Sequence, residues 1–149
     1  MNGSPKVNTT DIKNYVRCYF ESIYLEPITI LIDKMDYVVN DVLRFKIYDF
    51  WNKSDEELLS DFEDYTFKGD YIGTIFFFLS GYWEYIHNDI KDMYRRFPAK
   101  ESFAYRKGML EEPVVDILAD KIKNELGLHY KDERPKAFLT HDVDHLGLP

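Results

Sequence analysis

Residues 71–86 read YIGTIFFFLSGYWEYI and are the most apolar stretch of this 149-residue chain. At helical spacing, one face of the stretch carries six large apolar side chains: Ile72, Ile75, Phe76, Leu79, Trp83 and Ile86. Phe77, Phe78 and Tyr82 cover much of the remaining surface, and a helix that is apolar nearly all round is a buried one. A membrane-spanning helix takes about 20 residues, and this stretch is shorter. The stretch therefore predicts a helix in the core of the fold and no membrane span.

A second helix is expected on the C-terminal side, where Glu112-Pro113 opens an amphipathic segment. Proline suits the first helical position because that position has no partner for an N–H group. The apolar stripe of this helix consists of Val114, Val115, Leu118, Ile122 and Leu126. Gly127 is a natural C-terminal cap. The polar run Asp132–Pro135 has the composition of a linker, so we place a domain boundary before Lys136.

The first third of the chain combines helices with short strands. Asn8 to Asp11 supply capping side chains for a helix with a clear apolar stripe: Ile12, Tyr15, Val16, Tyr19, Phe20 and Ile23. Strands are expected at Ile28–Ile32, Tyr37–Val39 and Leu43–Phe50, with a tight turn at Asn40-Asp41.

A capping box at Ser54–Glu57 opens one more short helix, which runs to Phe62. We therefore predict an α+β fold, in which a small antiparallel sheet packs against the buried helix of residues 71–86 and the C-terminal helix of residues 113–126.

Composition narrows the function classes. The formal net charge is -8 and no long basic run exists, so neither nucleic acid nor an anionic membrane surface is an expected partner. The single cysteine, Cys18, excludes an internal disulfide, and without a neighbouring histidine we interpret it as a filler thiol rather than a nucleophile. The N-terminal residues lack the apolar core of a signal peptide, so a cytoplasmic location is expected.

The densest group of chemically active side chains lies in residues 136–149, which read KAFLTHDVDHLGLP. Asp142 and Asp144 are two residues apart, so on an extended strand their side chains leave the same face. Two carboxylates placed in this way suit metal-assisted hydrolysis, because one can hold a cation while the other takes a proton from water.

The stretch FLTHDVDH within it resembles the first motif of the bacterial polysaccharide deacetylases, carbohydrate esterase family 4 and its relatives. Two upstream segments, Asp70–Tyr85 and Arg96–Asp116, resemble the region that precedes the catalytic barrel in one branch of those proteins. Three segments in the right order strengthen a motif that would be weak alone. The resemblance covers roughly the second half of the chain.

The resemblance implies a metal-dependent hydrolase that removes acetyl groups from N-acetylated sugars of a polysaccharide. By position, Asp142 would be the catalytic base and Asp144 a ligand of a divalent metal such as zinc. Residues 1–135 would be an accessory domain of unknown role, and residues 136–149 the first strand of a truncated catalytic barrel.

The family completes its metal site with two histidines of a later motif, which no histidine here matches. A catalytic zinc needs about three protein ligands. We therefore expect this chain alone to be inactive, to hold zinc weakly at best, and to self-associate through the unpaired strand.

An alternative hypothesis is a stand-alone module that binds a glycan or a protein. The loop from Arg95 to Lys107 places cationic side chains beside aromatic ones, and its candidate contact residues are Arg95, Arg96, Tyr105 and Lys107. Arginine beside an aromatic ring can bind a carboxylate or stack on a sugar. A solvated loop without a ligand is the competing interpretation.

His87 with Asp89 and Asp92 suggests either a metal site or a helix end that meets solvent.

Overall fold

The computed structural model describes residues 7–131, which form an α+β fold with a three-stranded antiparallel sheet and a separate two-stranded hairpin. In chain order, the elements are α1 (Thr9–Ile23), β1 (Ile30–Asp33), β2 (Asp36–Val39), β3 (Leu43–Lys46), η1 (Phe50–Asn52), α2 (Asp55–Asp61), β4 (Phe62–Glu63), β5 (Thr66–Phe67), α3 (Tyr71–Leu79), α4 (Tyr82–Ile86), η2 (Ala99–Glu101), α5 (Phe103–Arg106) and α6 (Val114–Leu126). The predicted fold class is confirmed. The barrel strand expected within residues 136–149 lies outside the described residues.

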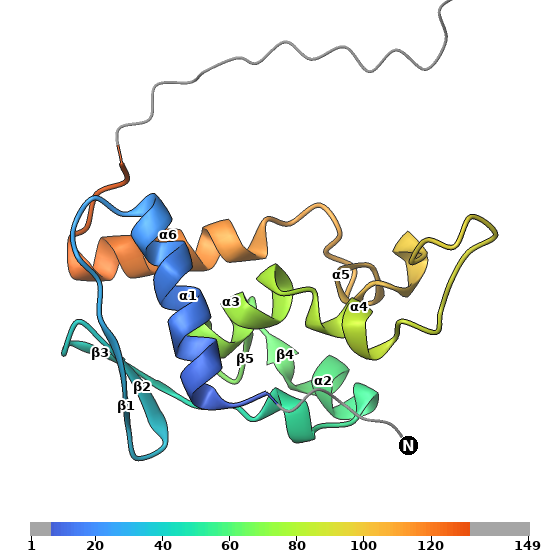
Figure 1. The fold of residues 1–149 in the computed structure, drawn as a ribbon, viewed down its shortest axis with the longest axis horizontal. Coiled ribbons are helices and arrows are strands. Elements are labelled where there is room, and N and C mark those ends of the chain that lie inside the picture. Colours follow the sequence, from blue (N-terminus) through green and yellow to red (C-terminus); the bar gives the residue numbers. More distant parts are fainter. Residues whose placement is uncertain (1–6, 132–149) are drawn as a thin grey trace, which may run out of the picture.

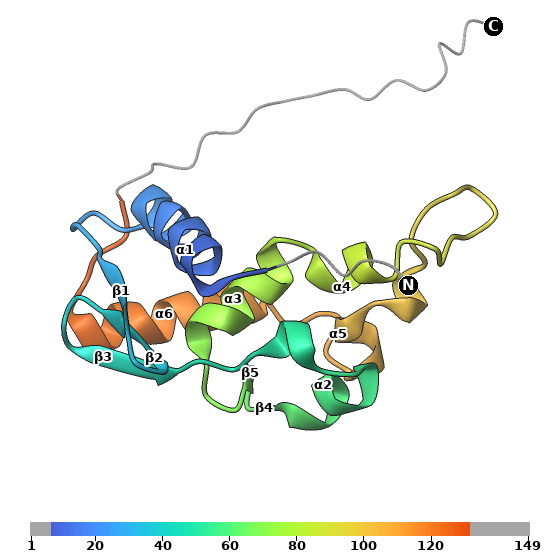
Figure 2. The same cartoon turned by 60° about the horizontal axis from the view of Figure 1, so that its bottom comes forward.

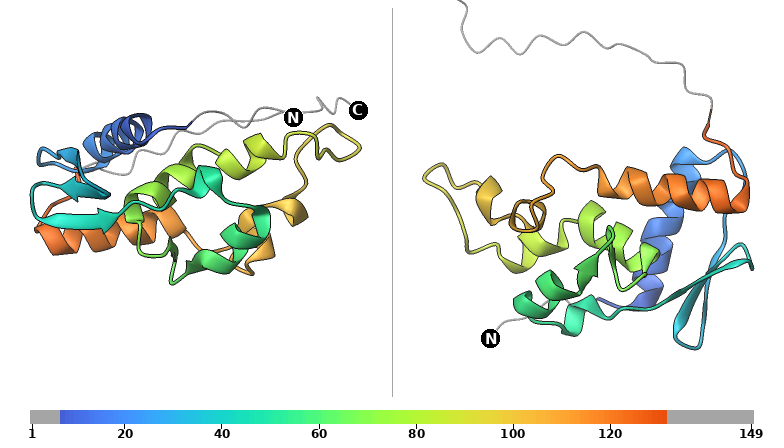
Figure 3. Two further views of the ribbon diagram at one scale, coloured as in Figure 1. Left: turned by 90° about the horizontal axis from the view of Figure 1, so that it is seen from below. Right: turned by 180° about the vertical axis from the view of Figure 1, so that it is seen from behind.

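Helix α3 is the centre of the fold and packs against both α1 and α6. The front and back views show that α1 and α6 cross one another (Figure 1, Figure 3). The Tyr24 hydroxyl, immediately after α1, donates to the Ala119 carbonyl of α6 at 2.5 Å and fastens this crossing. The three-stranded sheet lies at one end of the molecule, whereas α4, α5 and the long loop between them lie at the other (Figure 2). Of the helices within residues 7–131, none is long and apolar enough to cross a bilayer.

The helices begin and end at the capping residues that the sequence offers. The Asn8 side chain accepts from the Asp11 N–H at 2.8 Å, and the Ser54 hydroxyl accepts from the Glu57 N–H at 3.2 Å. Gly127 closes α6 with φ +66°, a left-handed conformation that glycine adopts without a Cβ clash. The two predicted N-terminal caps and the predicted C-terminal cap are therefore confirmed.

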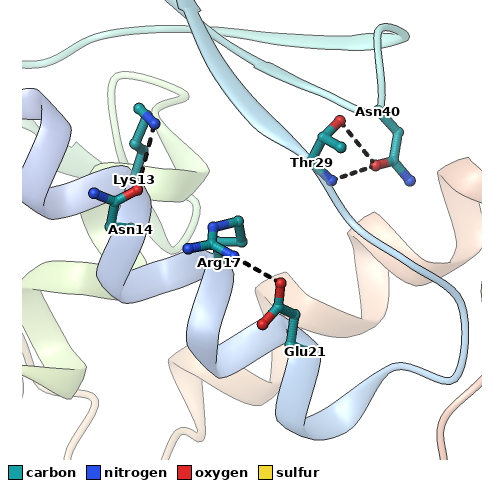
Figure 4. Close-up of polar contacts among 6 residues, drawn as sticks. All are labelled: Lys13, Asn14, Arg17, Glu21, Thr29 and Asn40. Carbon is teal, nitrogen blue, oxygen red and sulfur yellow. Dashed lines mark hydrogen bonds and ion pairs between the residues drawn. The ribbon is translucent and has the colours of Figure 1, made fainter.

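The three-stranded sheet has the order β1-β2-β3, and Tyr37 of β2 lies opposite Ile32 of β1 and Phe45 of β3. Asn40 adopts φ +50° in the turn after β2. Its side-chain oxygen accepts from the Thr29 N–H at 2.7 Å, so the predicted turn is also tied to the segment that enters β1 (Figure 4).

The third strand is shorter than predicted. We expected a strand over Leu43–Phe50, but β3 ends at Lys46 and Phe50 begins η1. The Tyr48 N–H donates to the Asp70 carboxylate at 2.9 Å instead of to a neighbouring strand. The Ile47 N–H still donates to the Met35 carbonyl at 2.8 Å, and directly after it the Asp70 side chain, from another part of the chain, holds the backbone.

The helix predicted over Tyr71–Ile86 is divided in two. Helix α3 ends at Leu79, Gly81 adopts φ +67°, and α4 begins at Tyr82. Because of this break, the apolar residues of the stretch do not share one face. Leu79 is 37 % exposed, whereas Phe77, which we had placed off that face, is 1 % exposed. The prediction of a single helix was wrong, while the prediction of a buried stretch is confirmed.

Phe77 occupies the middle of an aromatic cluster at the core. Its ring lies 4.8–5.7 Å, between ring centroids, from five other rings: Phe50, Phe67, Phe78, Tyr82 and Phe103. Aromatic pairs at such spacings contribute stability beyond the area that they bury. The neighbouring Phe76 is only half-buried and contacts the rings of Tyr15 and Phe50.

We expect Phe77→Ala to lower the free energy of unfolding by about 3–5 kcal/mol, because it removes a fully buried ring and leaves a cavity. Phe76→Ala, on the same helix, is the matched control and should cost clearly less, because part of its ring already contacts water. Denaturant titration of the two variants measures the difference. Equal losses would contradict the central position of Phe77.

Candidate functional site

The carboxylates of the deacetylase-like motif, Asp142 and Asp144, lie outside the described residues. Within residues 7–131, no group of three His, Cys, Asp or Glu side chains is arranged to hold a metal ion. A divalent metal held through Asp144 therefore stays a prediction that concerns the C-terminal residues.

The four candidate contact residues of the loop have different surroundings. Tyr105 is 45 % exposed, and Arg95 and Arg96 are also exposed. Lys107 instead donates from Nζ to the Leu59 carbonyl at 2.8 Å and is partly buried. Lys107 therefore holds α5 against α2, and of the four candidate residues the exposed cations are Arg95 and Arg96.

The tip of the loop is held in shape by Asp92. This carboxylate accepts from the N–H groups of Tyr94 and Arg96 at 2.7 and 2.9 Å and from the Arg96 guanidinium at 3.2 Å. These hydrogen bonds from Arg96 and Tyr94 hold the pKa of Asp92 below its usual value. The Arg96 guanidinium lies 4.8 Å from the centre of the exposed Tyr94 ring. The loop that follows α4 extends away from the body of the fold (Figure 2), and the Arg96–Tyr94 pair on it is exposed.

The hydrogen-bond partners of His87 lie on α2 and α4 and are not the acidic residues that follow it in sequence. Its Nε2 lies 2.8 Å from Asp55 of α2, and its Nδ1 lies 2.7 Å from the Trp83 carbonyl. Both ring nitrogens therefore lie within hydrogen-bond distance of an oxygen atom. His87 therefore fastens α4 to α2. This geometry favours the structural interpretation over a metal site with Asp89 and Asp92.

A polar pocket that the sequence did not reveal lies between α2, the β4–β5 hairpin, the start of α3, and α6. Its volume is about 490 Å³, and its side chains include Asp61, Glu63, Asp64, Lys68, Tyr71 and Lys121. Asp61 accepts from the Tyr48 hydroxyl at 2.7 Å, and its other oxygen lies 3.8 Å from Lys68 Nζ. Carboxylates, ammonium groups and an aromatic ring around one cavity can bind a small hydroxylated molecule.

Sequence reasoning missed this pocket for two reasons. The β4–β5 hairpin turns at Asp64-Tyr65, with φ +52° and +68°, and this pair lacks the glycine of the usual hairpin signal. Lys121 reaches the pocket from α6, far along the chain. The polar composition of residues 60–64 was the available signal, but it did not indicate a cavity.

Asp70 organises the backbone beside this pocket. It is 1 % exposed, and its two carboxylate oxygens accept from the N–H groups of Gly73 and Tyr48, each at 2.9 Å. Its side chain therefore caps α3 and anchors the segment that follows β3. A Cβ on Gly73 would clash with the buried, hydrogen-bonded carboxylate of Asp70, so the cap requires glycine at this position.

The protonation of Asp70 reflects its burial. Desolvation raises the pKa of Asp70 to about 7, although the backbone N–H groups of Tyr48, Gly73 and Ile72 oppose this shift by stabilising the carboxylate. The buried Tyr37 hydroxyl has no hydrogen-bond partner among the described residues. Burial and the charge of Asp70 both raise the pKa of Tyr37.

The fold and its surface define a small α+β domain with a polar pocket and an exposed arginine–tyrosine tip. The chain belongs to a family of unknown function (DUF7033), whose model matches residues 4–131. No curated protein and no solved structure matches the chain.

We expect Asp70→Asn to destabilise the fold, because an amide has a single acceptor atom and leaves either the Tyr48 or the Gly73 N–H without its partner. The loss should also depend on pH. The folded-state pKa of Asp70 lies above its unfolded value near 4, so its contribution to stability is full at acidic pH and is lost as pH rises towards 7. Denaturant titrations of parent and variant at several pH values measure this difference.

The stability difference between parent and variant should therefore be largest near pH 4 and shrink by pH 7. Asp92→Asn is a useful control, because the pKa of Asp92 is lowered in the folded state. The Asp92 carboxylate therefore stabilises the fold above pH 4, and this stabilisation is lost as pH falls, which is the opposite of the pH dependence expected for Asp70. A gap for Asp70→Asn that widens between pH 4 and 7 would show that the folded state favours the ionised carboxylate.

Proposed function

We propose that residues 7–131 are an accessory domain that precedes a metal-dependent deacetylase of N-acetylated sugars. The observation that carries the proposal is the stretch FLTHDVDH at residues 138–145, which follows the domain directly and resembles the first deacetylase motif. The two upstream segments of the resemblance support it, because they supply α3, α4 and α5, which surround the aromatic core.

The way in which the described chain closes supports the same division. The Lys131 N–H donates to the Ile23 carbonyl at 2.9 Å, and the Leu25 N–H donates to the His129 carbonyl at 2.8 Å. The last described residues are thus fastened to the end of α1, which lies near the beginning of the chain (Figure 1). The family match also ends at residue 131. The linker Asp132–Pro135 would place the motif directly beside the accessory domain.

The proposed chemistry assigns separate roles to the two carboxylates. Asp144 would ligate a divalent metal together with two histidines from a later motif, and the metal would polarise the acetamide carbonyl and a water molecule. Asp142 would act as the base that takes the proton from that water. The substrate class is a polysaccharide with N-acetylated sugars.

We expect the reading frame beyond codon 149 to encode the remainder of a barrel, with two histidines three or four residues apart. A protein that contains both parts should release acetate from N-acetylglucosamine oligomers in the presence of Zn²⁺. Asp142→Asn should lower kcat at least about 100-fold, because a general base contributes 10²–10⁴. Asp89→Asn, an exposed loop residue, is the matched control and should retain activity. A downstream frame without such a barrel would refute the proposal.

A second candidate function is a glycan- or protein-binding module, and the stacked Arg96 and Tyr94 at the loop tip favour it. The Asp92 hydrogen bonds hold this pair in place before any ligand arrives, which lowers the entropy cost of binding. An exposed planar guanidinium beside an aromatic ring suits a sugar face or a carboxylate-bearing partner.

We expect calorimetric titration of the 149-residue chain with N-acetylglucosamine oligomers to show binding that Arg96→Ala weakens about tenfold or more, which corresponds to about 1.4 kcal/mol. Arg17→Ala is the matched control, because Arg17 is a partly exposed arginine on α1 that pairs with Glu21. Equal affinities of the two variants would exclude the tip as the sugar-binding surface.

A further inference from the structure

A second pocket, on the opposite side of α3 from α6, lies along α1 and has no occupant among the described residues. Its volume is about 600 Å³, and it is lined by Asp11, Asn14, Tyr15, Cys18, Tyr19 and Leu79, with apolar atoms forming most of its surface. We call it the α1 pocket. Tyr15 is 43 % exposed and Leu79 is 37 % exposed, so two large apolar side chains meet solvent there.

The α1 pocket is built by the packing of α1 on α3. The Tyr15 ring meets Phe76 edge-on at 5.2 Å, and the Tyr15 hydroxyl donates to the Leu79 carbonyl at 3.3 Å. These contacts hold the Tyr15 ring on one wall and Leu79 on the other. The rim is polar, because Asp11 and Asn14 belong to the lining, and the Asn14 side chain accepts from Lys13 Nζ at 3.3 Å (Figure 4).

The path of the chain brings a suitable occupant to this pocket. Lys131 is hydrogen-bonded to Ile23, at the C-terminal end of the same helix. Along an α-helix, Cys18 lies about 8 Å and Asp11 about 18 Å from Ile23. Ala137 follows Lys131 by six residues, which span up to about 20 Å when extended. The first apolar run after the described residues, Ala137-Phe138-Leu139, is therefore within reach of the whole length of the pocket.

The composition of that run matches the pocket. Between Lys131 and Ala137 the residues are polar or proline, and Thr140 to Asp142 after the run are polar again. A short apolar run with polar flanks fits a short apolar pocket with a polar rim. Burying a Phe and a Leu side chain against Tyr15 and Leu79 removes apolar surface from water on both sides.

We propose that the α1 pocket is the docking site for the chain's own C-terminal segment, with Phe138 and Leu139 as the apolar contacts. This inference does not rest on the proposed function. If both hold, the α1 pocket is the place where the accessory domain contacts the first strand of the catalytic domain.

Cys18 provides a direct test, because it lines the α1 pocket, is exposed, and is the single cysteine of the sequence. The rate at which iodoacetamide alkylates Cys18 is measured for the 149-residue chain and for the same chain with Phe138→Asp and Leu139→Asp. A segment docked about 90 % of the time slows the reaction about tenfold. The double variant should therefore react about tenfold faster than the parent.

Leu146→Asp with Leu148→Asp is the matched control: it adds the same two charges outside the apolar run and should react at the parent rate. Each rate is normalised to that of the denatured chain, and circular dichroism confirms that every variant is folded. Protection that is independent of protein concentration supports docking within one chain. The proposal would be overturned if the parent and the first variant react at equal rates, or if the control reacts faster than the parent. Protection that grows with protein concentration would also overturn it, because it would identify a second copy of the chain as the occupant.

Discussion

A buried carboxylate, Asp70, is the interaction on which the two halves of this fold depend. One of its oxygens caps α3, and the other holds the backbone N–H of Tyr48, which leads out of the three-stranded sheet. This one side chain therefore joins the central helix to the segment that leaves the sheet, beside the stacked rings of Phe45 in β3 and Tyr71 in α3. Removing an ionised carboxylate from water is unfavourable in free energy. Backbone N–H donors stabilise the carboxylate of Asp70, and its burial raises the pKa to about 7, which favours the uncharged form.

The same carboxylate constrains its neighbours. Gly73 cannot carry a side chain without a clash with Asp70, and the nearby Tyr37 hydroxyl stays without a partner among the described residues. Asp70 also lies immediately after the residues that shape the polar pocket, from Asp61 to Gly69.

The described residues and the C-terminal motif contribute different parts of the functional argument. Residues 70–85 and 96–116, on which the proposed resemblance rests, contribute Phe77, Phe78, Tyr82 and Phe103 to the aromatic core, which Phe50 and Phe67 complete. The chemistry of the proposal rests on Asp142 and Asp144, beyond the described residues. What the fold adds is a set of surfaces: the polar pocket, the tip held by Asp92, and the α1 pocket.

The sequence by itself determined the features that arise from local interactions. Helix caps at Asn8, Ser54 and Gly127 were predictable because each cap involves backbone groups within a few residues. The apolar stripes predicted which helices are buried, and the exposed loop near Arg96 followed from its polar composition. The fold class was predictable for the same reason.

Tertiary structure decided the features that require partners distant in sequence. The backbone after β3 is held by Asp70, the role of Lys107 depends on the Leu59 carbonyl, and the polar pocket needs Lys121 of α6. The break at Gly81 is a related case: glycine permits the left-handed turn, but a glycine within an apolar helix does not require it. Only the packing of α4 beside the core, with Trp83 buried, selects that conformation.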